Sequence, residues 1–298
     1  MGGINVRLAR WPALFVLALG AALTGCQGDD EAARTNTVYP VETRPLDAEG
    51  AVIPERAATT LQLPSAPGVR YAGLYAAEER GFFEDVKLDV TILPGGANVD
   101  PARAVASGRA DFGIDTLPAL LAARDDGTDV VSIAQVFSRS GSVLEDARAG
   151  LPADGIFAAR GWLENFENRD LAVRFLQASF LGWVFCRDYP EECVQILHNE
   201  VPAVDEVRQR RQLNEINALI WPNETGIGTM APATFERASR SAQRLGLIER
   251  PATGSAWRDD LALLAVTEGQ DEEDARTSQH YDLLGQYWEK PTVDPEPG

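Results

Sequence analysis

The period of the hydrophobic positions changes several times between residues 60 and 137. Leu88, Val90 and Ile92 alternate with polar residues, which is the two-residue period of a half-buried strand. Asp100 and Pro101 are typical of a helix start, and Gly108 of its end. Strands are predicted at 61–63, 88–92, 110–114 and 130–137, with helices at 72–80, 101–107 and 117–124 between them. This alternation predicts an α/β fold, with a parallel sheet covered by flanking helices.

Two polar segments flank this predicted domain. Residues 26–59 are polar, contain Pro40, Pro45 and Pro54 and have no hydrophobic period, so we expect a flexible tether. Residues 269–298 form an acidic, proline-containing extension. Its candidate docking residues are Tyr281, Leu284, Tyr287 and Trp288. The predicted α/β domain is accordingly placed at 60–268.

The first 25 residues have the pattern of an export signal. Arg7 and Arg10 precede an apolar run over residues 11–23, which is shorter than the ~20 apolar residues that a bilayer-spanning helix needs. The run ends in Leu23-Thr24-Gly25-Cys26, which resembles a bacterial lipobox. The resemblance implies a lipoprotein signal peptide over 1–25 and a lipid on Cys26, which anchors the chain outside the cytoplasm to the cell membrane or outer membrane. An ordinary signal peptide with an incidental cysteine is the alternative.

Charge and composition exclude several classes of function. The formal net charge is −18, and Lys87 and Lys290 are the only lysines, so we expect no nucleic-acid partner and no attraction to an anionic membrane surface. The two histidines and three cysteines show no metal-ligand spacing, and no nucleophile elbow, phosphate loop or dinucleotide motif occurs. The sequence therefore predicts no enzyme activity, no cofactor and no metal.

Candidate ligand-binding residues follow the predicted strands. Ligands of open α/β sheets bind at the carboxyl ends of the strands. Gly95 and Gly96 could let the backbone approach a ligand closely, or they could form a plain turn. Phe137 or Tyr71 could stack on a planar solute, but Phe137 could equally be a core residue. The candidates are Pro64, Arg70, Tyr71, Gly95, Gly96, Asp115, Thr116, Gln135, Phe137 and Arg139.

Cys186 and Cys193 flank a predicted turn between two helices. A helix is predicted over 170–186, and Pro190 with two following glutamates begins the next. This spacing favours a disulfide in an oxidising compartment, with free buried thiols as the alternative.

A series of short motifs resembles one family over residues 60–265. They are Tyr71-Ala-Gly-Leu-Tyr-Ala-Ala, Gly81-Phe-Phe, Leu88-Asp-Val, Pro94-Gly-Gly, Gly108-Arg-Ala-Asp-Phe-Gly-Ile, Asp154-Gly-Ile-Phe, Gly182-Trp, Cys186-Arg-Asp and Asn214-Glu-Ile-Asn-Ala-Leu-Ile-Trp-Pro. The chain is similar to the NMT/THI-like substrate-binding proteins of ABC transporters, the group for thiamine-pyrimidine, nitrate, sulfonate and taurine. The resemblance implies a type II periplasmic-binding-protein fold, a small-molecule solute and an ABC-transporter permease as partner.

The same resemblance indicates a missing second lobe. Family members hold the solute between two lobes, but here residues 145–150 occupy the place of a lobe of about 100 residues. We therefore expect a deletion point near 144–151 and weakened solute binding, unless a homodimer rebuilds the cleft. A one-lobed lipoprotein that serves as a protein-interaction module is the alternative function. Either the lobe was lost naturally or the gene prediction omits it.

Overall fold

The computed structural model describes residues 56–138, 153–202, 205–271, 283 and 285. In this part of the chain one sheet contains five strands, in the order β2-β1-β3-β5-β4. The strands are β1 (Ala57–Gln62), β2 (Leu88–Leu93), β3 (Phe112–Thr116), β4 (Val130–Ala134) and β5 (Asp154–Ala159). Cys26 and Arg139, together with the candidate docking residues of the extension and the expected deletion point, lie outside the described residues.

The sheet is mixed rather than purely parallel. β1 runs parallel to β2 and β3, but β5 is inserted between β3 and β4 and runs antiparallel to both. The purely parallel sheet predicted from the first four strands was therefore incomplete. Because β5 enters from the opposite direction, its first residue lies at the same edge as the last residues of β1 to β4.

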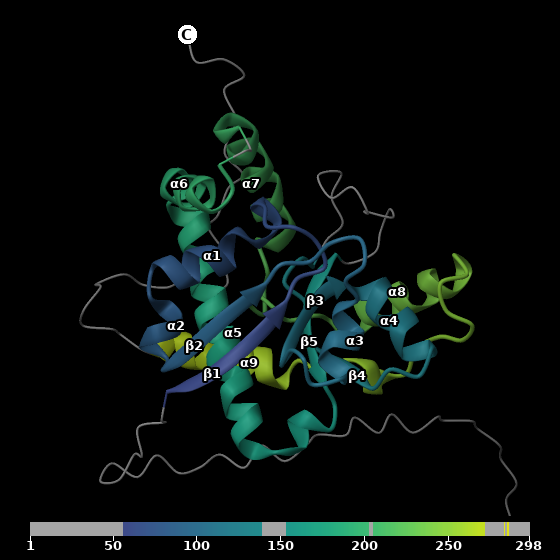
Figure 1. The fold of residues 1–298 in the computed structure, drawn as a ribbon. Helices are drawn as coiled ribbons and strands as arrows, with labels where there is room; N and C mark the ends of the chain where they lie inside the picture. Colours follow the sequence, from purple (N-terminus) through teal and green to yellow (C-terminus); the bar gives the residue numbers. More distant parts are fainter. Residues whose placement is uncertain (1–55, 139–152, 203–204, 272–282, 284, 286–298) are drawn as a thin grey trace, which may run out of the picture. The chain divides into compact units, whose positions relative to one another are not determined.

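Two hydrophobic clusters cover the two faces of the sheet. One joins Leu61, Phe112 and Ile156 to the helices α1 (Ala72–Glu79), α2 (Phe82–Asp85), α5 (Phe166–Asp188) and α9 (Asp260–Asp271). The other joins Phe157 to α3 (Pro101–Ala106), α4 (Leu117–Asp125) and α8 (Pro232–Arg244). Figure 1 shows α3 in front of the strands and α5 with α9 behind them. The helices α6 (Pro190–Glu200) and α7 (Glu206–Ile220) extend beyond the sheet at the end of α5.

The helix starts follow the capping chemistry of the sequence. The Asp100 carboxylate accepts a hydrogen bond from the Arg103 amide at 2.9 Å, and Pro101 is the first residue of α3, as predicted. The Thr116 hydroxyl caps α4 by accepting from the Ala119 amide at 3.3 Å. α5 begins at Phe166, four residues before the predicted helix, because the Asn165 side chain accepts from the Glu167 amide.

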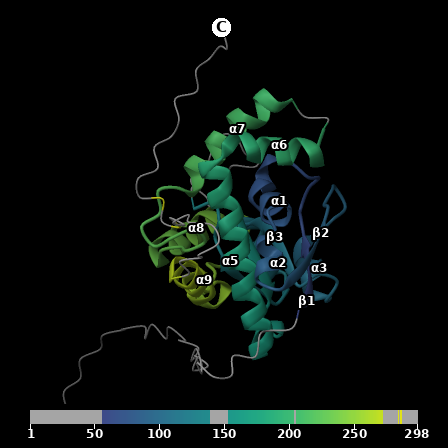
Figure 2. The ribbon, with the colours of Figure 1, turned by 90° about the vertical axis from the view of Figure 1, so that its left-hand side faces the viewer.

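The long helix α5 lies against α1 and α2 on one side and α9 on another (Figure 2). Gly182 makes the contact with α1 possible, since a Cβ there would lie 1.9 Å from the Gly73 carbonyl oxygen. A glycine at this crossing lets the two helix backbones approach closely.

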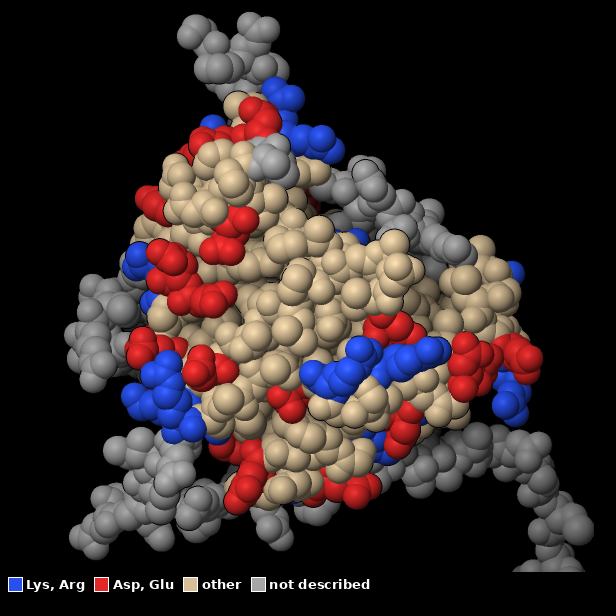
Figure 3. Space-filling model, viewed as in Figure 1, with Lys and Arg blue, Asp and Glu red and all other residues tan. Residues whose placement is uncertain are grey.

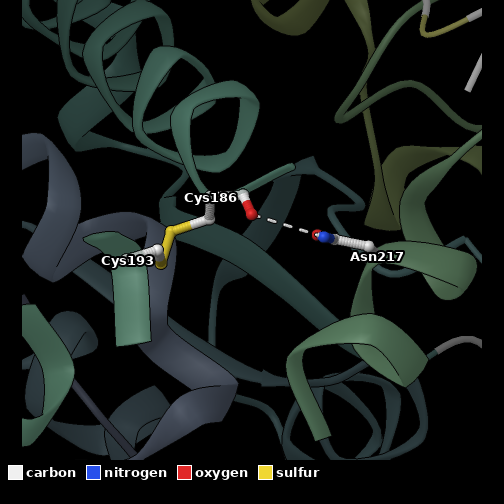
Figure 4. The surroundings of a disulfide bond; sticks show 3 residues. All are labelled: Cys186, Cys193 and Asn217. Atoms are coloured by element: carbon white, nitrogen blue, oxygen red, sulfur yellow. Dashed lines mark hydrogen bonds between the residues drawn. A yellow bond between two sulfur atoms is a disulfide. The ribbon is translucent and has the colours of Figure 1, made fainter. Parts of the chain in front are cut away.

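A disulfide joins Cys186 near the end of α5 to Cys193 in the first turn of α6 (Figure 4). The Asn217 side chain of α7 donates a hydrogen bond to the Cys186 carbonyl oxygen at 3.5 Å. Short 3-10 turns lie at Val69–Tyr71 (η1), Trp162–Glu164 (η2) and Gly254–Ala256 (η3).

The carboxyl-terminal extension contributes one residue to the core. Leu283 is fully buried, and its carbonyl oxygen accepts a hydrogen bond from the Ile227 amide at 3.2 Å. This contact lies beyond the boundary at 268 that the sequence predicts for the lobe. Among the described residues, no helix combines the length and apolar character needed to cross a bilayer.

Candidate functional site

The candidate site lies at one edge of the sheet, where β1 to β4 end and β5 begins. Thr116, the last residue of β3, pairs with Asp154, the first residue of β5, and Gln62 of β1 pairs with Leu93 of β2. The loops that follow these strands therefore meet here, as expected from the strand order. All of the described candidate residues from the sequence belong to this edge or to the loops directly behind it.

Arg70 of η1 and Asp154 of β5 form an ion pair at this edge. The guanidinium donates two hydrogen bonds to the carboxylate, from Nε to Oδ2 and from Nη2 to Oδ1. The exposed fractions of the two side chains are 19% and 5%. A buried charge requires such a partner, so each member of the pair holds the other in place.

Asp154 was not among the candidate residues predicted from the sequence. It lies 84 positions from Arg70, and pairing over such a distance has no local pattern. The available signal was a carboxylate placed directly before the apolar run Gly155–Ala159.

Asp115 of β3 is the second carboxylate of the edge. Its Oδ1 accepts a hydrogen bond from the Thr116 amide at 2.7 Å. Burial raises the pKa of Asp115 to about 6, and the negative charges of Asp154 and Asp100 act in the same direction, while the Thr116 amide and Arg70 oppose them. Asp115 is therefore ionised at pH 7 at a free-energy cost, which a donor or a positive charge would offset.

Tyr71 is buried beside the ion pair, and its hydroxyl lies 2.8 Å from the Ser65 hydroxyl in a hydrogen bond. Burial raises the pKa of Tyr71 to about 12, and the charge of Asp154 adds to the effect. The hydroxyl stays neutral, and the buried ring offers no open face for stacking on a solute.

The loops after β1 and β2 pack tightly against each other. The Gly95 amide donates to the Ser65 carbonyl oxygen at 2.9 Å, and a Cβ at Gly95 would lie 2.2 Å from the carbonyl carbon of Pro64. Gly95 thus serves packing between the two loops, whereas Gly96 has open space around its Cα. The Gln62 amide nitrogen ties the same loops by donating to the carbonyl oxygens of Leu63, Leu93 and Pro94.

Gln135, directly after β4, is 1% exposed and fixes the start of β5. Its amide nitrogen donates to the backbone oxygens of Phe137, Ala153 and Asp154 at 2.9–3.2 Å. Its Oε1 atom is buried and has no hydrogen-bond partner among the described residues. An unpaired buried carbonyl oxygen is costly, so this atom is a candidate acceptor for a ligand.

Phe137 lies in the core rather than at the surface of the edge. Its ring is fully buried and contacts Trp183 of α5 edge-to-face, with centroids 5.5 Å apart. Of the candidate residues, the structure therefore brings Arg70, Asp115, Thr116 and Gln135 together as polar groups, with Tyr71 beneath them.

The described side chains of the edge are charged and hydrogen-bonding groups. In the described ranges, no three His, Cys, Asp or Glu side chains are placed to hold a metal ion. His198 lies on α6, with its Nε2 3.9 Å from Glu206 Oε1. Figure 3 shows acidic side chains spread over the face of the molecule that carries α3 and the strands.

Part of this chain matches a known protein family. Residues 69–150 match the family model described as "NMT1/THI5 like", which confirms the resemblance over that segment. Among curated proteins, none matches the sequence.

Solved structures extend the likeness to the whole described domain. A periplasmic sulfonate-binding protein SsuA of a putative sulfonate ABC transporter from Methylobacillus flagellatus KT has a TM-score of 0.53 at 13% identity, covering 74% of this chain and 97% of its own. The periplasmic nitrate-binding protein NrtA from Synechocystis PCC 6803 has a TM-score of 0.52 at 14% identity, with 72% and 89% covered. A protein from Bordetella bronchiseptica RB50 gives 0.53 at 13% identity, with 71% and 98% covered. The chain thus has the α/β fold of periplasmic binding proteins, as predicted.

Proposed function

We propose that this chain is the extracytoplasmic solute-binding component of an ABC importer for a small organic solute. It delivers the solute to a membrane permease and is held at the membrane by a lipid on Cys26. No catalytic step is part of this function, which consists of binding and release.

The observation that carries the proposal is the set of polar groups at the carboxyl edge of the sheet. Arg70, Asp115 and Gln135 come from three segments of the chain and meet where ligands of open α/β sheets bind. The match of residues 69–150 to the NMT1/THI5-like family model supports the same function. The names of the similar structures suggest sulfonates and nitrate as solutes to test, and the family adds the thiamine pyrimidine.

The proposed loss of the second lobe predicts weak binding. A solute held by one lobe stays largely open to water, and its polar contacts then compete with water for the same groups. An affinity near 1 µM for a closed two-lobed protein would fall toward 1 mM if about half of the contacts were lost.

Thermal unfolding of residues 27–298 tests the proposal. The residues after 268 are kept, because Leu283 belongs to the core. Unfolding is followed with and without millimolar thiamine pyrimidine, taurine, an alkanesulfonate, nitrate and small organic amines. A solute that binds only the native state raises the midpoint temperature, by an amount that grows with its concentration. A midpoint that none of these solutes moves would contradict the proposed function.

The lipid anchor is tested separately in a bacterial host. Labelling with a radioactive fatty acid should mark the wild-type chain, and the Cys26→Ala variant should lose both the label and the membrane association. Equal labelling of the two chains would contradict lipidation at Cys26.

The alternative function, a one-lobed interaction module, requires an apolar docking face at the same edge. Among the described residues, the exposed large hydrophobic side chains come from several different elements: Val99, Phe166, Tyr189, Val207, Leu245 and Leu263. Of these, Val99 belongs to a loop of the carboxyl edge, and the groups around the strand ends are polar. Solute binding is therefore the function that we propose first.

A further inference from the structure

The charge of the candidate site differs from what an anionic solute needs. The Arg70 guanidinium is directed at Asp154 through two hydrogen bonds, so its charge is already neutralised within the protein. Among the described residues, Asp115 has no such cation within hydrogen-bond distance, and its Oδ1 accepts from the Thr116 amide. A sulfonate or nitrate at this edge would therefore meet an uncompensated carboxylate.

Asp115 and Gln135 lie on the same face of the sheet, on either side of Gly155. Asp115 pairs directly with Gly155 in the antiparallel register of β3 and β5, and paired residues project to the same face. Gln135 reaches this position from the other side, since its Oε1 lies 3.2 Å from the place that a Cβ of Gly155 would take. The glycine leaves the space between the two side chains free of a side chain of its own.

The orientation of the Gln135 amide follows from its partners. The amide nitrogen faces three backbone carbonyl oxygens, which accept hydrogen bonds and cannot donate them. The other atom, which lies over Gly155, is therefore the oxygen. In the part of the chain that the structure describes, no donor lies within hydrogen-bond distance of this oxygen. Two side-chain acceptors, the Asp115 carboxylate and the Gln135 carbonyl oxygen, thus flank Gly155, and the Ala134 carbonyl oxygen lies 2.8 Å from the place of its missing Cβ.

We propose that this edge selects small organic solutes that carry N–H donors and a positive charge, such as amines and amidines, and that it disfavours anions. The inference rests on the proposed solute-binding function and names the chemical class of its solute. An N–H group placed over Gly155 would satisfy the unpaired Gln135 oxygen, and the positive charge would compensate Asp115. A charge-assisted hydrogen bond of this kind changes affinity by about tenfold or more.

A matched pair of probes tests the proposal. Benzamidinium and benzenesulfonate share an aromatic ring and carry opposite charges. Each is titrated into isotopically labelled protein, residues 27–298, at constant ionic strength, and the amide resonances of Thr116 and Gly155 are followed by NMR. We expect benzamidinium to shift both resonances with saturation and benzenesulfonate to leave them unchanged at the same concentration.

Two variants separate the site from the acidic surface as a whole. Asp115→Asn removes the proposed charge and keeps an acceptor for the Thr116 amide, while Asp89→Asn removes the same charge from an exposed position on β2. Benzamidinium should bind Asp115→Asn about tenfold more weakly or worse, and should bind Asp89→Asn as it binds the wild type. Cooperative thermal unfolding of both variants confirms that they fold.

The remaining outcomes overturn the proposal in distinguishable ways. Equal binding of benzamidinium to the wild type and Asp115→Asn would assign it to the acidic surface. Tighter binding of benzenesulfonate or nitrate would overturn the charge selection and leave solute binding intact. Binding of no probe, together with no solute effect on thermal unfolding, would overturn both the selection and the proposed function.

Discussion

The carboxyl edge of the sheet and the helical corner between α5 and α6 differ in how fully their polar groups are paired. In the corner, the Arg187 guanidinium forms two hydrogen bonds to Asp188 at 2.7 and 2.9 Å and lies over the Trp221 ring at 5.0 Å. The Cys186–Cys193 disulfide adjoins this pair. At the edge, by contrast, no described cation lies within hydrogen-bond distance of Asp115, and no described group donates a hydrogen bond to the Gln135 oxygen.

This difference indicates where the molecule gains stability and where it loses it. The corner is cross-linked and its charges are compensated, so it stabilises the helices behind the sheet. The edge keeps an ionised carboxylate and an unpaired carbonyl oxygen in buried surroundings, and both lower the free energy of unfolding. Groups of this kind are typical of sites that a ligand completes. Four predictions test the contrast, beginning with the largest expected effect.

The helix crossing beside the corner should be the least tolerant position. Gly182→Ala places a methyl group 1.9 Å from the Gly73 carbonyl oxygen, so α1 and α5 must separate. We expect the free energy of unfolding to fall by about 3 kcal/mol. Denaturation in urea measures this change. Gly161→Ala is the matched control, because Gly161 has open space around it and should change stability by less than about 1 kcal/mol.

Removal of the disulfide should have the next largest effect. The cross-link closes a short loop with a sequence separation of 7, and the entropy model gives about 2.5 kcal/mol for such a loop. Urea denaturation of the wild type with and without a reductant should show this loss. The Cys186→Ala/Cys193→Ala variant should be indifferent to the reductant. A wild type equally stable under both conditions would mean that the corner does not depend on its cross-link.

At the edge, removal of a charge should raise stability. The pKa of Asp115 is about 6 in the folded chain and near 4 in the unfolded chain, so the unfolded chain loses its proton first as pH rises. The loss of stability caused by ionised, buried Asp115 is absent below about pH 4, grows between about pH 4 and 6 and is complete above about pH 6. Asp115→Asn should therefore be about 2 kcal/mol more stable than the wild type at pH 7.5 and equal to it at pH 4. Asp89→Asn should lack this pH-dependent gain.

The Tyr71–Ser65 hydrogen bond should contribute least. Tyr71→Phe removes the hydroxyl that lies 2.8 Å from Ser65 and should lower the free energy of unfolding by about 1 kcal/mol. Ser65→Ala should cost a similar amount, and the double variant should cost less than the sum of the two. Strict additivity in this cycle would show that the two hydroxyls do not interact.

Local patterns were sufficient to predict most elements of the fold. The alternation of Leu88, Val90 and Ile92 predicted β2, and Asp100 with Pro101 predicted the start of α3. Pro190 likewise marked the first residue of α6. Each of these features depends on residues within one turn or one strand of each other, which is why a single sequence is enough to identify them.

Long-range partners were not predictable in the same way. The direction of β5 depends on pairing with β3 and β4, and the Arg70–Asp154 pair joins segments 84 residues apart. The described candidate residues do lie at or directly behind the carboxyl edge of the sheet, but neither Asp154 nor the unpaired oxygen of Gln135 was anticipated. Leu283 was missed for a similar reason, because a single apolar residue in an acidic extension has no periodic signal.

The inserted strand β5 has a consequence for the order in which the sheet can assemble. Within the described sheet β4 pairs with β5 alone, and β3 meets β4 only through β5. Without β5, β4 has no strand partner and one edge of β3 stays unpaired, and unpaired strand edges can attract other chains. When the chain emerges from its amino terminus, all residues up to 159 must be present before the five strands can pair completely. Completion of the five-stranded sheet therefore depends on a segment in the middle of the chain, and the edge of β3 stays unpaired until that segment is present.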